Sequence, residues 1–234
     1  GPRGYDEVNQ ARKAGFFGWP LFVGNNYPYR SYDYTTGISG DAFDPQRPLN
    51  ESRNNTGLRE LPPANPAFIW YPYVVSNDFP QMGTGGRNAM AGPVYYTDMY
   101  PKETRLPDYY NGKLIIYDWV RGWMKAVTML PNGDFDKMEP FFESARLNAC
   151  IDMEVGPDGR LYLLEYGSGW FSKNPDAGLF RIDYNYGNIA PKILSASVDK
   201  TSVNLPFTVK ASVNANDPDN GKLSYIWSLG DGTI

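Results

Sequence analysis

Short strand-like runs separated by turn residues dominate this sequence, and helical periodicity is weak almost everywhere. The clearest runs are residues 113–119, which follow the turn signal Asn111-Gly112, and residues 123–129, which precede Pro131. Similar runs occupy 67–71, 93–97, 138–142, 151–155, 160–166 and 179–184. Such a pattern predicts an all-β fold that is built from small antiparallel sheets.

The runs between residues 67 and 184 fall into two successive groups of about four short strands, and the second group opens with the run 138–142. This rhythm predicts consecutive blades of a β-propeller. Residues 24–66 are polar and tyrosine-rich, and we expect them to form a long excursion without strands. We expect this segment to pack on the propeller. The alternative is that its tyrosine rings stack on the rings of a bound sugar.

The pattern changes near Gly187, and we place a domain boundary there, with domains of residues 1–187 and 188–234. Beyond it, residues 193–198 and 207–213 alternate apolar and polar side chains, as half-buried sandwich strands do. Residues 223–227 continue the pattern. Too few strands are present for either a closed propeller or a complete sandwich, so we expect both ends of the chain to interrupt a domain.

Composition excludes several classes of function. The chain has no histidine, which excludes a His-based triad, a histidine base and His-ligated zinc within these residues. A net charge of −4 gives no electrostatic sign of nucleic-acid binding, and no run approaches the 18 apolar residues of a transmembrane helix. The one cysteine, Cys150, stands in an apolar run and is expected to be buried and inert.

Several stretches, taken in order, resemble the glucose/sorbosone dehydrogenase family. They are Gly1-Pro2-Arg3-Gly4-Tyr5-Asp6-Glu7-Val8-Asn9, Gly18-Trp19-Pro20, Gly85-Gly86-Arg87, Gly92-Pro93-Val94-Tyr95, Tyr109-Tyr110-Asn111-Gly112-Lys113-Leu114, Tyr117-Asp118-Trp119-Val120-Arg121-Gly122 and Gly156-Pro157-Asp158-Gly159. Separately, Asp217-Pro218-Asp219 and Tyr225-Ile226-Trp227-Ser228-Leu229-Gly230-Asp231-Gly232 resemble the first half of an immunoglobulin-like PKD domain. The resemblance implies the C-terminal blades of a six-bladed propeller, followed by the first strands of a PKD β-sandwich.

The resemblance also implies a secreted, periplasmic or cell-surface bacterial protein that oxidises an aldose by hydride transfer to pyrroloquinoline quinone (PQQ), beside a calcium ion. Gly1 and Pro2 match the family position that offers two carbonyls to calcium, and Glu7 matches a nearby acidic ligand. Arginines suit the carboxylates of the quinone, and the candidates in this chain are Arg87, Arg121 and Arg146. The family's histidine base lies upstream of the Gly-Pro motif, so no catalytic residue is assigned here.

Two departures from the family pattern keep a second function open. Val120 stands where some quinone-binding members have a lysine, and Ala149, Cys150 and Ile151 occupy the region of a pair of arginines. The alternative is a non-catalytic propeller and PKD protein that binds carbohydrate or protein at the cell surface, as part of an outer-membrane uptake assembly. The expected partners are a carbohydrate, the remainder of the propeller and other surface proteins.

For two groups of polar residues we expect a structural role instead of a catalytic or metal-binding one. Asp118 and Arg121 flank a predicted hairpin, where we expect a structural ion pair between them. Residues 132–136 resemble a calcium loop but lack its later glutamate, so they are predicted to form a plain turn.

Overall fold

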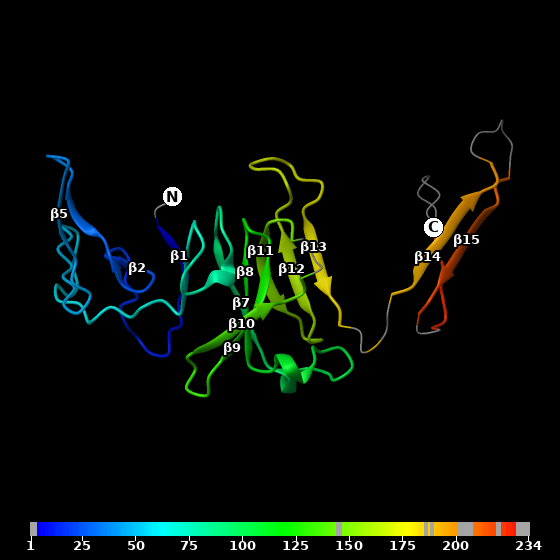
Figure 1. Ribbon diagram of the computed structural model, residues 1–234, viewed down its shortest axis with the longest axis horizontal. Coiled ribbons are helices and arrows are strands. Elements are labelled where there is room, and N and C mark those ends of the chain that lie inside the picture. The colour runs from blue at the N-terminus through cyan, green and yellow to red at the C-terminus, as the bar shows by residue number, and fades with distance from the viewer. Residues whose placement is uncertain are drawn as a thin grey trace. The chain divides into compact units, whose positions relative to one another are not determined.

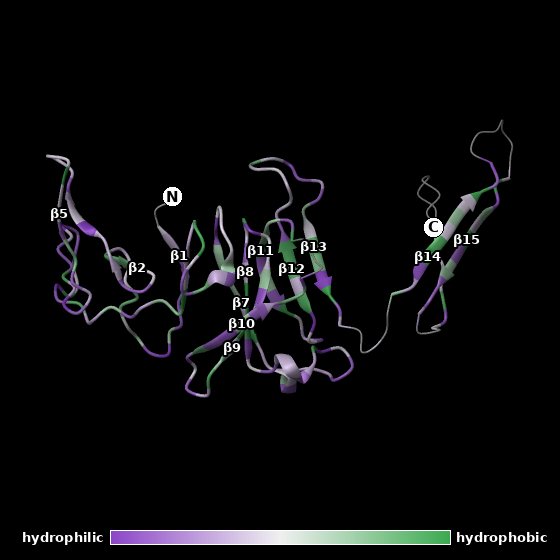
Figure 2. Ribbon diagram, in the orientation of Figure 1, coloured by the Kyte–Doolittle hydropathy of each residue, from purple (hydrophilic) through white to green (hydrophobic). Residues whose placement is uncertain are grey.

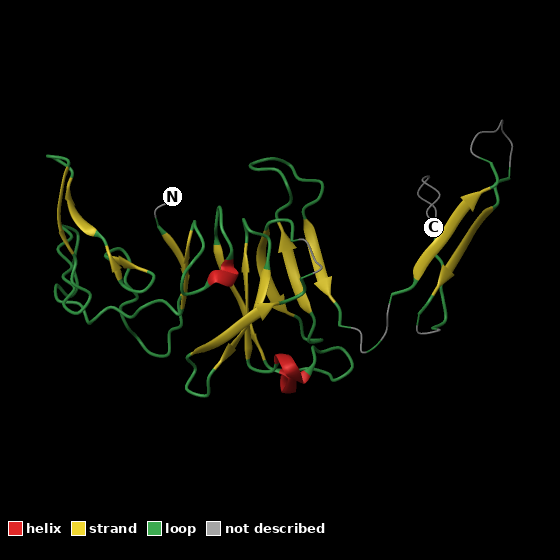
Figure 3. Cartoon of the chain, in the orientation of Figure 1, coloured by secondary structure: helices red, strands yellow, loops and turns green. Residues whose placement is uncertain are grey.

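The regular secondary structure of the described residues is almost entirely β-strand, which confirms the all-β prediction. The computed structural model describes residues 4–143, 147–184, 187, 190–200, 208–218 and 221–227. Within those ranges the helical elements are three short 3₁₀ turns, η1 (Pro80–Met82), η2 (Thr97–Met99) and η3 (Asp108–Tyr110) (Figure 3). The strands are β1 (Tyr5–Val8), β2 (Phe22–Val23), β3 (Tyr27–Pro28), β4 (Arg30–Asp33), β5 (Ile38–Ala42), β6 (Ile69–Pro72), β7 (Ala89–Tyr95), β8 (Lys113–Asp118), β9 (Met124–Met129), β10 (Phe135–Pro140), β11 (Cys150–Val155), β12 (Leu161–Glu165), β13 (Gly178–Ile182), β14 (Lys192–Val198) and β15 (Ala211–Asn216).

The chain forms two compact units, residues 1–184 and 185–234. The larger unit contains β1 to β13, and the smaller one contains the antiparallel pair β14 and β15. No helix of the described residues is long and apolar enough to cross a bilayer.

Three antiparallel sheets make up the body of the larger unit (Figure 1). β1 pairs with β6, β7 to β10 form a four-stranded sheet in chain order, and β11 to β13 form a three-stranded sheet in chain order. Short turns join β8 to β9, β9 to β10 and β11 to β12. The turn predicted at Gly156-Pro157-Asp158-Gly159 is confirmed, since it joins β11 to β12 and Gly156 donates its N–H to the carbonyl of Arg160 at 2.9 Å.

Strand β8 of the four-stranded sheet is buried on both faces, which explains its continuous apolar run. Ile115 and Tyr117 point into a core that is shared with the three-stranded sheet, whereas Ile116 points into a core that is shared with β1 and β6. Because successive side chains of a strand alternate between faces, a strand between two cores must be apolar on both. The core strand β12 is likewise strongly hydrophobic (Figure 2).

The first strands of the three sheets lie next to one another. β7 is in contact with β1 on one side and with β11 on the other. The three sheets therefore pack against one another through their first strands β1, β7 and β11.

Three expectations about individual strands were wrong. Residues 24–66 contain β3, which pairs with β2, and the hairpin of β4 and β5, instead of an excursion without strands. β10 pairs with β9, so the run 138–142 closes the first group instead of opening the second. Residues 223–227 form no strand in the structure.

Candidate functional site

Several loops lie at one end of the strands, and we call the surface that they form the loop face. It consists of residues 83–88, 118–123, 147–149 and 166–177. Ala89 pairs with Asp118 across β7 and β8, which brings the first two loops together. Cys150 pairs with Glu165 across β11 and β12, which does the same for the last two. Since β7 lies against β11, the two halves share one surface.

Asp118 ends β8 and organises the loops around it. Its carboxylate is completely buried, and it accepts hydrogen bonds from the hydroxyl of Tyr71 (2.6 Å) and the N–H groups of Asn88 (3.1 Å), Val120 (2.9 Å) and Arg121 (2.7 Å). These donors offset the desolvation of the carboxylate. Burial and the hydrogen bond to Asp118 both raise the pKa of Tyr71. The expected ion pair between Asp118 and the side chain of Arg121 is therefore wrong. Asp118 instead accepts a hydrogen bond from the main-chain N–H of Arg121.

The guanidinium of Arg121 binds the main chain of neighbouring loops. It donates to the carbonyl oxygens of Gly86 (2.9 Å), Met82 (2.7 Å), Pro72 (2.9 Å) and Gly85 (3.1 Å). A planar guanidinium with five donors suits this arrangement, whereas an ammonium group does not. Arg121 therefore positions residues 82–86, and its donors are largely used within the protein.

Arg87 lies on the loop face at the start of β7, but its charge is also matched within the protein. Its Nε is 3.0 Å from Oδ1 of Asp6 on β1, and its side chain is only 6% exposed. The other carboxylate oxygen of Asp6 accepts the N–H of Ala89 at 3.2 Å. The structure brings Arg87 and Arg121 to the same face, and Arg146 lies outside the described residues.

The candidate calcium ligands are only partly described. Gly1 and Pro2 lie outside the described residues. On β1, Glu7 accepts the N–H of Gly24 through Oε2 (2.5 Å) and the side-chain amide of Asn9 through Oε1 (3.0 Å). Among the residues that the structure describes, no three histidine, cysteine, aspartate or glutamate side chains gather into a metal-binding group.

The loop face also carries a cluster of aromatic rings, which we call the aromatic platform: Trp119, Tyr166, Trp170 and Phe171. The ring of Trp119 lies 6.0 Å from that of Tyr166 and 5.0 Å from that of Trp170, and Trp170 and Phe171 are 4.7 Å apart. Trp170 is 66% exposed and Phe171 84% exposed. Large aromatic side chains that are this exposed and adjacent point to an interaction site.

Side-chain hydrogen bonds fix the loop that presents the platform. The amide nitrogen of Asn174 donates to the carbonyls of Tyr166 and Gly169, both at 2.8 Å. Asp176 accepts the N–H of Ser168 at 3.1 Å. The two exposed rings are therefore held on an ordered loop, and ligand binding would not have to order it first.

Sequence reasoning had not assigned the platform to the site. A signal was present, because Trp170 and Phe171 stand in a loop of Gly, Ser, Asn and Asp residues between two strands. Large aromatics in such a polar loop have no strand face on which to pack. Tyr71 gave no comparable signal, since it stands in an apolar strand.

Comparisons of the chain with protein-family models, with curated proteins and with solved structures found no match.

Proposed function

We propose that residues 1–187 are a sector of a glucose/sorbosone dehydrogenase-like β-propeller that recognises carbohydrate on its loop face. The observation that carries the proposal is the exposed pair Trp170 and Phe171, held beside Trp119 on an ordered loop. Aromatic rings stack on the apolar faces of sugars, and a rigid loop lowers the entropic cost of binding. The packed sheets, with adjacent first strands β1, β7 and β11, support the propeller.

We propose oxidation of an aldose, with PQQ and calcium, as the reaction of the complete propeller. When bound, the quinone would accept the hydride, and the histidine base would come from outside this chain. The described residues do not fit the quinone by themselves. Arg121 is bound to four carbonyls and Arg87 to Asp6, so neither offers a free guanidinium to carboxylates.

That disagreement favours a second candidate function, a propeller that binds carbohydrate without oxidising it. In this case the arginines of the loop face serve only to order its loops. The carbohydrate site on the aromatic platform is common to both candidates, and only the reaction separates them.

We further propose that residues 188–234 begin a PKD module. The antiparallel pair β14 and β15, which is joined from Lys192↔Asn216 to Val198↔Ala211, supports this assignment. Because PKD modules are usually extracellular spacers or adhesion elements, the protein would lie in the periplasm, at the cell surface or outside the cell. We propose other surface proteins as its partners in an outer-membrane uptake assembly.

The experiment uses the full-length protein that contains this chain, loaded with calcium and PQQ. Gel filtration measures whether quinone absorbance stays with the protein, and dye reduction with aldoses measures oxidation. Quinone retention together with dye reduction would support the dehydrogenase. Sugar binding without dye reduction would support the non-catalytic candidate.

A matched pair of variants tests the aromatic platform. Trp170→Ala removes an exposed ring of the platform, and Trp19→Ala removes an indole that is 75% exposed elsewhere. We expect Trp170→Ala to weaken carbohydrate binding about tenfold, whereas Trp19→Ala leaves it unchanged. Equal binding by both variants and the wild type would refute the site.

A further inference from the structure

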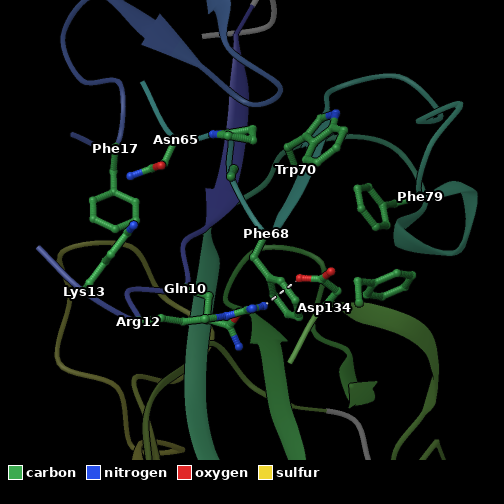
Figure 4. Close-up of a pocket in the computed structure, with 12 residues that line it drawn as sticks. Gln10, Arg12, Lys13, Phe17, Asn65, Phe68, Trp70, Phe79 and Asp134 are labelled. Atoms are coloured by element: carbon green, nitrogen blue, oxygen red, sulfur yellow. Dashed lines mark hydrogen bonds and ion pairs between the residues drawn. The ribbon is translucent and has the colours of Figure 1, made fainter. Parts of the chain in front are cut away.

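A pocket lies at the opposite end of the strands from the loop face. It encloses about 580 Å³ between the segment that follows β1, the segment that precedes β6 and the turn between β9 and β10 (Figure 4). That turn follows Met129, the last residue of β9, whereas the loop face adjoins Met124, the first. The volume lies in the range of small-ligand sites.

Aromatic rings form the walls of this pocket. Phe79 contacts both Trp70 and Phe135 edge-on, with ring centroids 4.9 Å and 5.2 Å apart. Phe68 contacts Phe135 edge-on at 6.2 Å. Phe17 lies across the pocket from Trp70 and Phe79 (Figure 4). These interlocked rings hold one another in place, so the aromatic surface is already formed without a ligand.

Polar groups line the pocket alongside these rings. Arg12 donates to Oδ1 of Asp134 at 2.8 Å, to Oε1 of Gln10 at 2.8 Å and to the carbonyl of Asn132 at 2.6 Å. The Arg12–Asp134 pair stays about half exposed. Asn65 adds a side-chain amide to the lining. Donors and acceptors that are fixed beside aromatic rings are what a sugar requires, because its hydroxyls and its apolar ring faces need separate partners.

The pocket lining carries more positive than negative charge: Arg12 and Lys13 against Asp134. Arg12 is matched by Asp134, whereas Lys13 forms no ion pair with a carboxylate in the described ranges. Lys13 and Phe17 both line the pocket, on the side away from Trp70 and Phe79 in this view (Figure 4). One positive charge therefore remains available within the pocket, and it would attract an anionic ligand group.

We propose that this pocket binds an acidic oligosaccharide, with a uronic acid ring against the aromatic walls and its carboxylate at Lys13. In this proposal the aromatic rings contact the apolar face of the sugar ring, and the Arg12–Asp134 pair forms hydrogen bonds with its hydroxyls. The ammonium of Lys13 pairs with the carboxylate of the uronic acid. The inference does not depend on the reaction of the propeller or on the aromatic platform, because the two sites share no residue.

Calorimetric titration of the full chain with tetragalacturonate, and with a neutral tetrasaccharide of galactose, tests the site. Lys13→Gln is the test variant and Lys102→Gln the control, since both lysines are exposed and only Lys13 lines the pocket. We expect tetragalacturonate to bind more tightly than the neutral sugar, and less tightly as salt is raised. Lys13→Gln should lower its affinity about tenfold, and Lys102→Gln should not.

Three results would overturn the proposal: no binding of tetragalacturonate by the wild type, equal binding of the neutral sugar, or an unchanged affinity in Lys13→Gln. A Phe17→Ala variant adds a second readout, because Phe17 lines the pocket but is absent from the interlocked ring cluster. It should weaken both sugars, whereas Lys13→Gln weakens only the acidic one. Trp170→Ala on the loop face should leave the effect of Lys13→Gln on tetragalacturonate binding unchanged.

Discussion

The hydroxyl of Tyr71 donates a 2.6 Å hydrogen bond to Oδ2 of Asp118, and both side chains are completely buried. The two residues are 47 positions apart in the sequence, on β6 and β8. Their contact ties the two-stranded sheet of β1 and β6 to the four-stranded sheet, directly beneath the loop face. The same carboxylate caps the turn that carries Trp119 of the aromatic platform.

Substitution of this pair should therefore destabilise the larger unit. We expect Asp118→Ala to cost about 3–5 kcal/mol, because it leaves one buried hydroxyl and three partly buried N–H groups without their acceptor. Tyr71→Phe removes one hydrogen bond to a charged group and should cost about 1.5–3 kcal/mol. Urea unfolding, followed by circular dichroism, measures both losses. A loss below that of Tyr71→Phe in the Asp118 variant would contradict this account.

Arg121→Lys tests whether the guanidinium is needed to order residues 82–86. An ammonium cannot reach four carbonyls in different directions, so we expect a loss of about 2 kcal/mol and faster proteolysis of this segment. Arg59→Lys is the matched control, because Arg59 forms an exposed ion pair with Glu51. Equal stability of the two variants would refute a positioning role for Arg121.

Alkaline pH should unfold the larger unit cooperatively. Burial raises the pKa values of Tyr71 and Tyr117 above their ordinary value of about 10. The folded protein therefore holds these protons more tightly than the unfolded chain, so stability is intact below pH 10 and falls as the pH rises above it. Absorbance at the tyrosinate band should show these two residues ionising together with the loss of circular dichroism. Complete tyrosine ionisation at unchanged circular dichroism would contradict the prediction.

The strands of the body could be predicted from the sequence because burial marks them locally. The run 113–119 is recognisable since Ile115 and Ile116 face two different cores, and the structure ends the strand one residue earlier. The hairpin of β4 and β5 was not predicted, because its residues are exposed on both faces and its sequence does not alternate apolar and polar side chains. Local composition carries no signal for such strands.

The pairing of strands and the partners of charged residues could not be predicted, because both depend on contacts between distant segments. Nothing near residues 135–140 indicates that they pair with β9 instead of β11. The sequence likewise marks Arg121 as a cation between two strands, but its acceptor at Pro72 is 49 residues away. The sequence therefore supplied Arg121 as a candidate ligand, while the structure was needed to find that its guanidinium is bound within the protein.

The thiol of Cys150 should not react with disulfide reagents while the protein is folded. Its side chain is fully buried in the core between the four-stranded and three-stranded sheets, which confirms the expected burial. Burial raises the pKa of the thiol to about 11, so the reactive thiolate is scarce at pH 8. We expect a disulfide reagent to label Cys150 only after urea unfolding, with the labelling rate in buffer set by opening of the core. Asp118→Ala should speed that reaction by lowering the stability of the unit, and rapid labelling of the native wild type at pH 8 would show that the thiol is accessible.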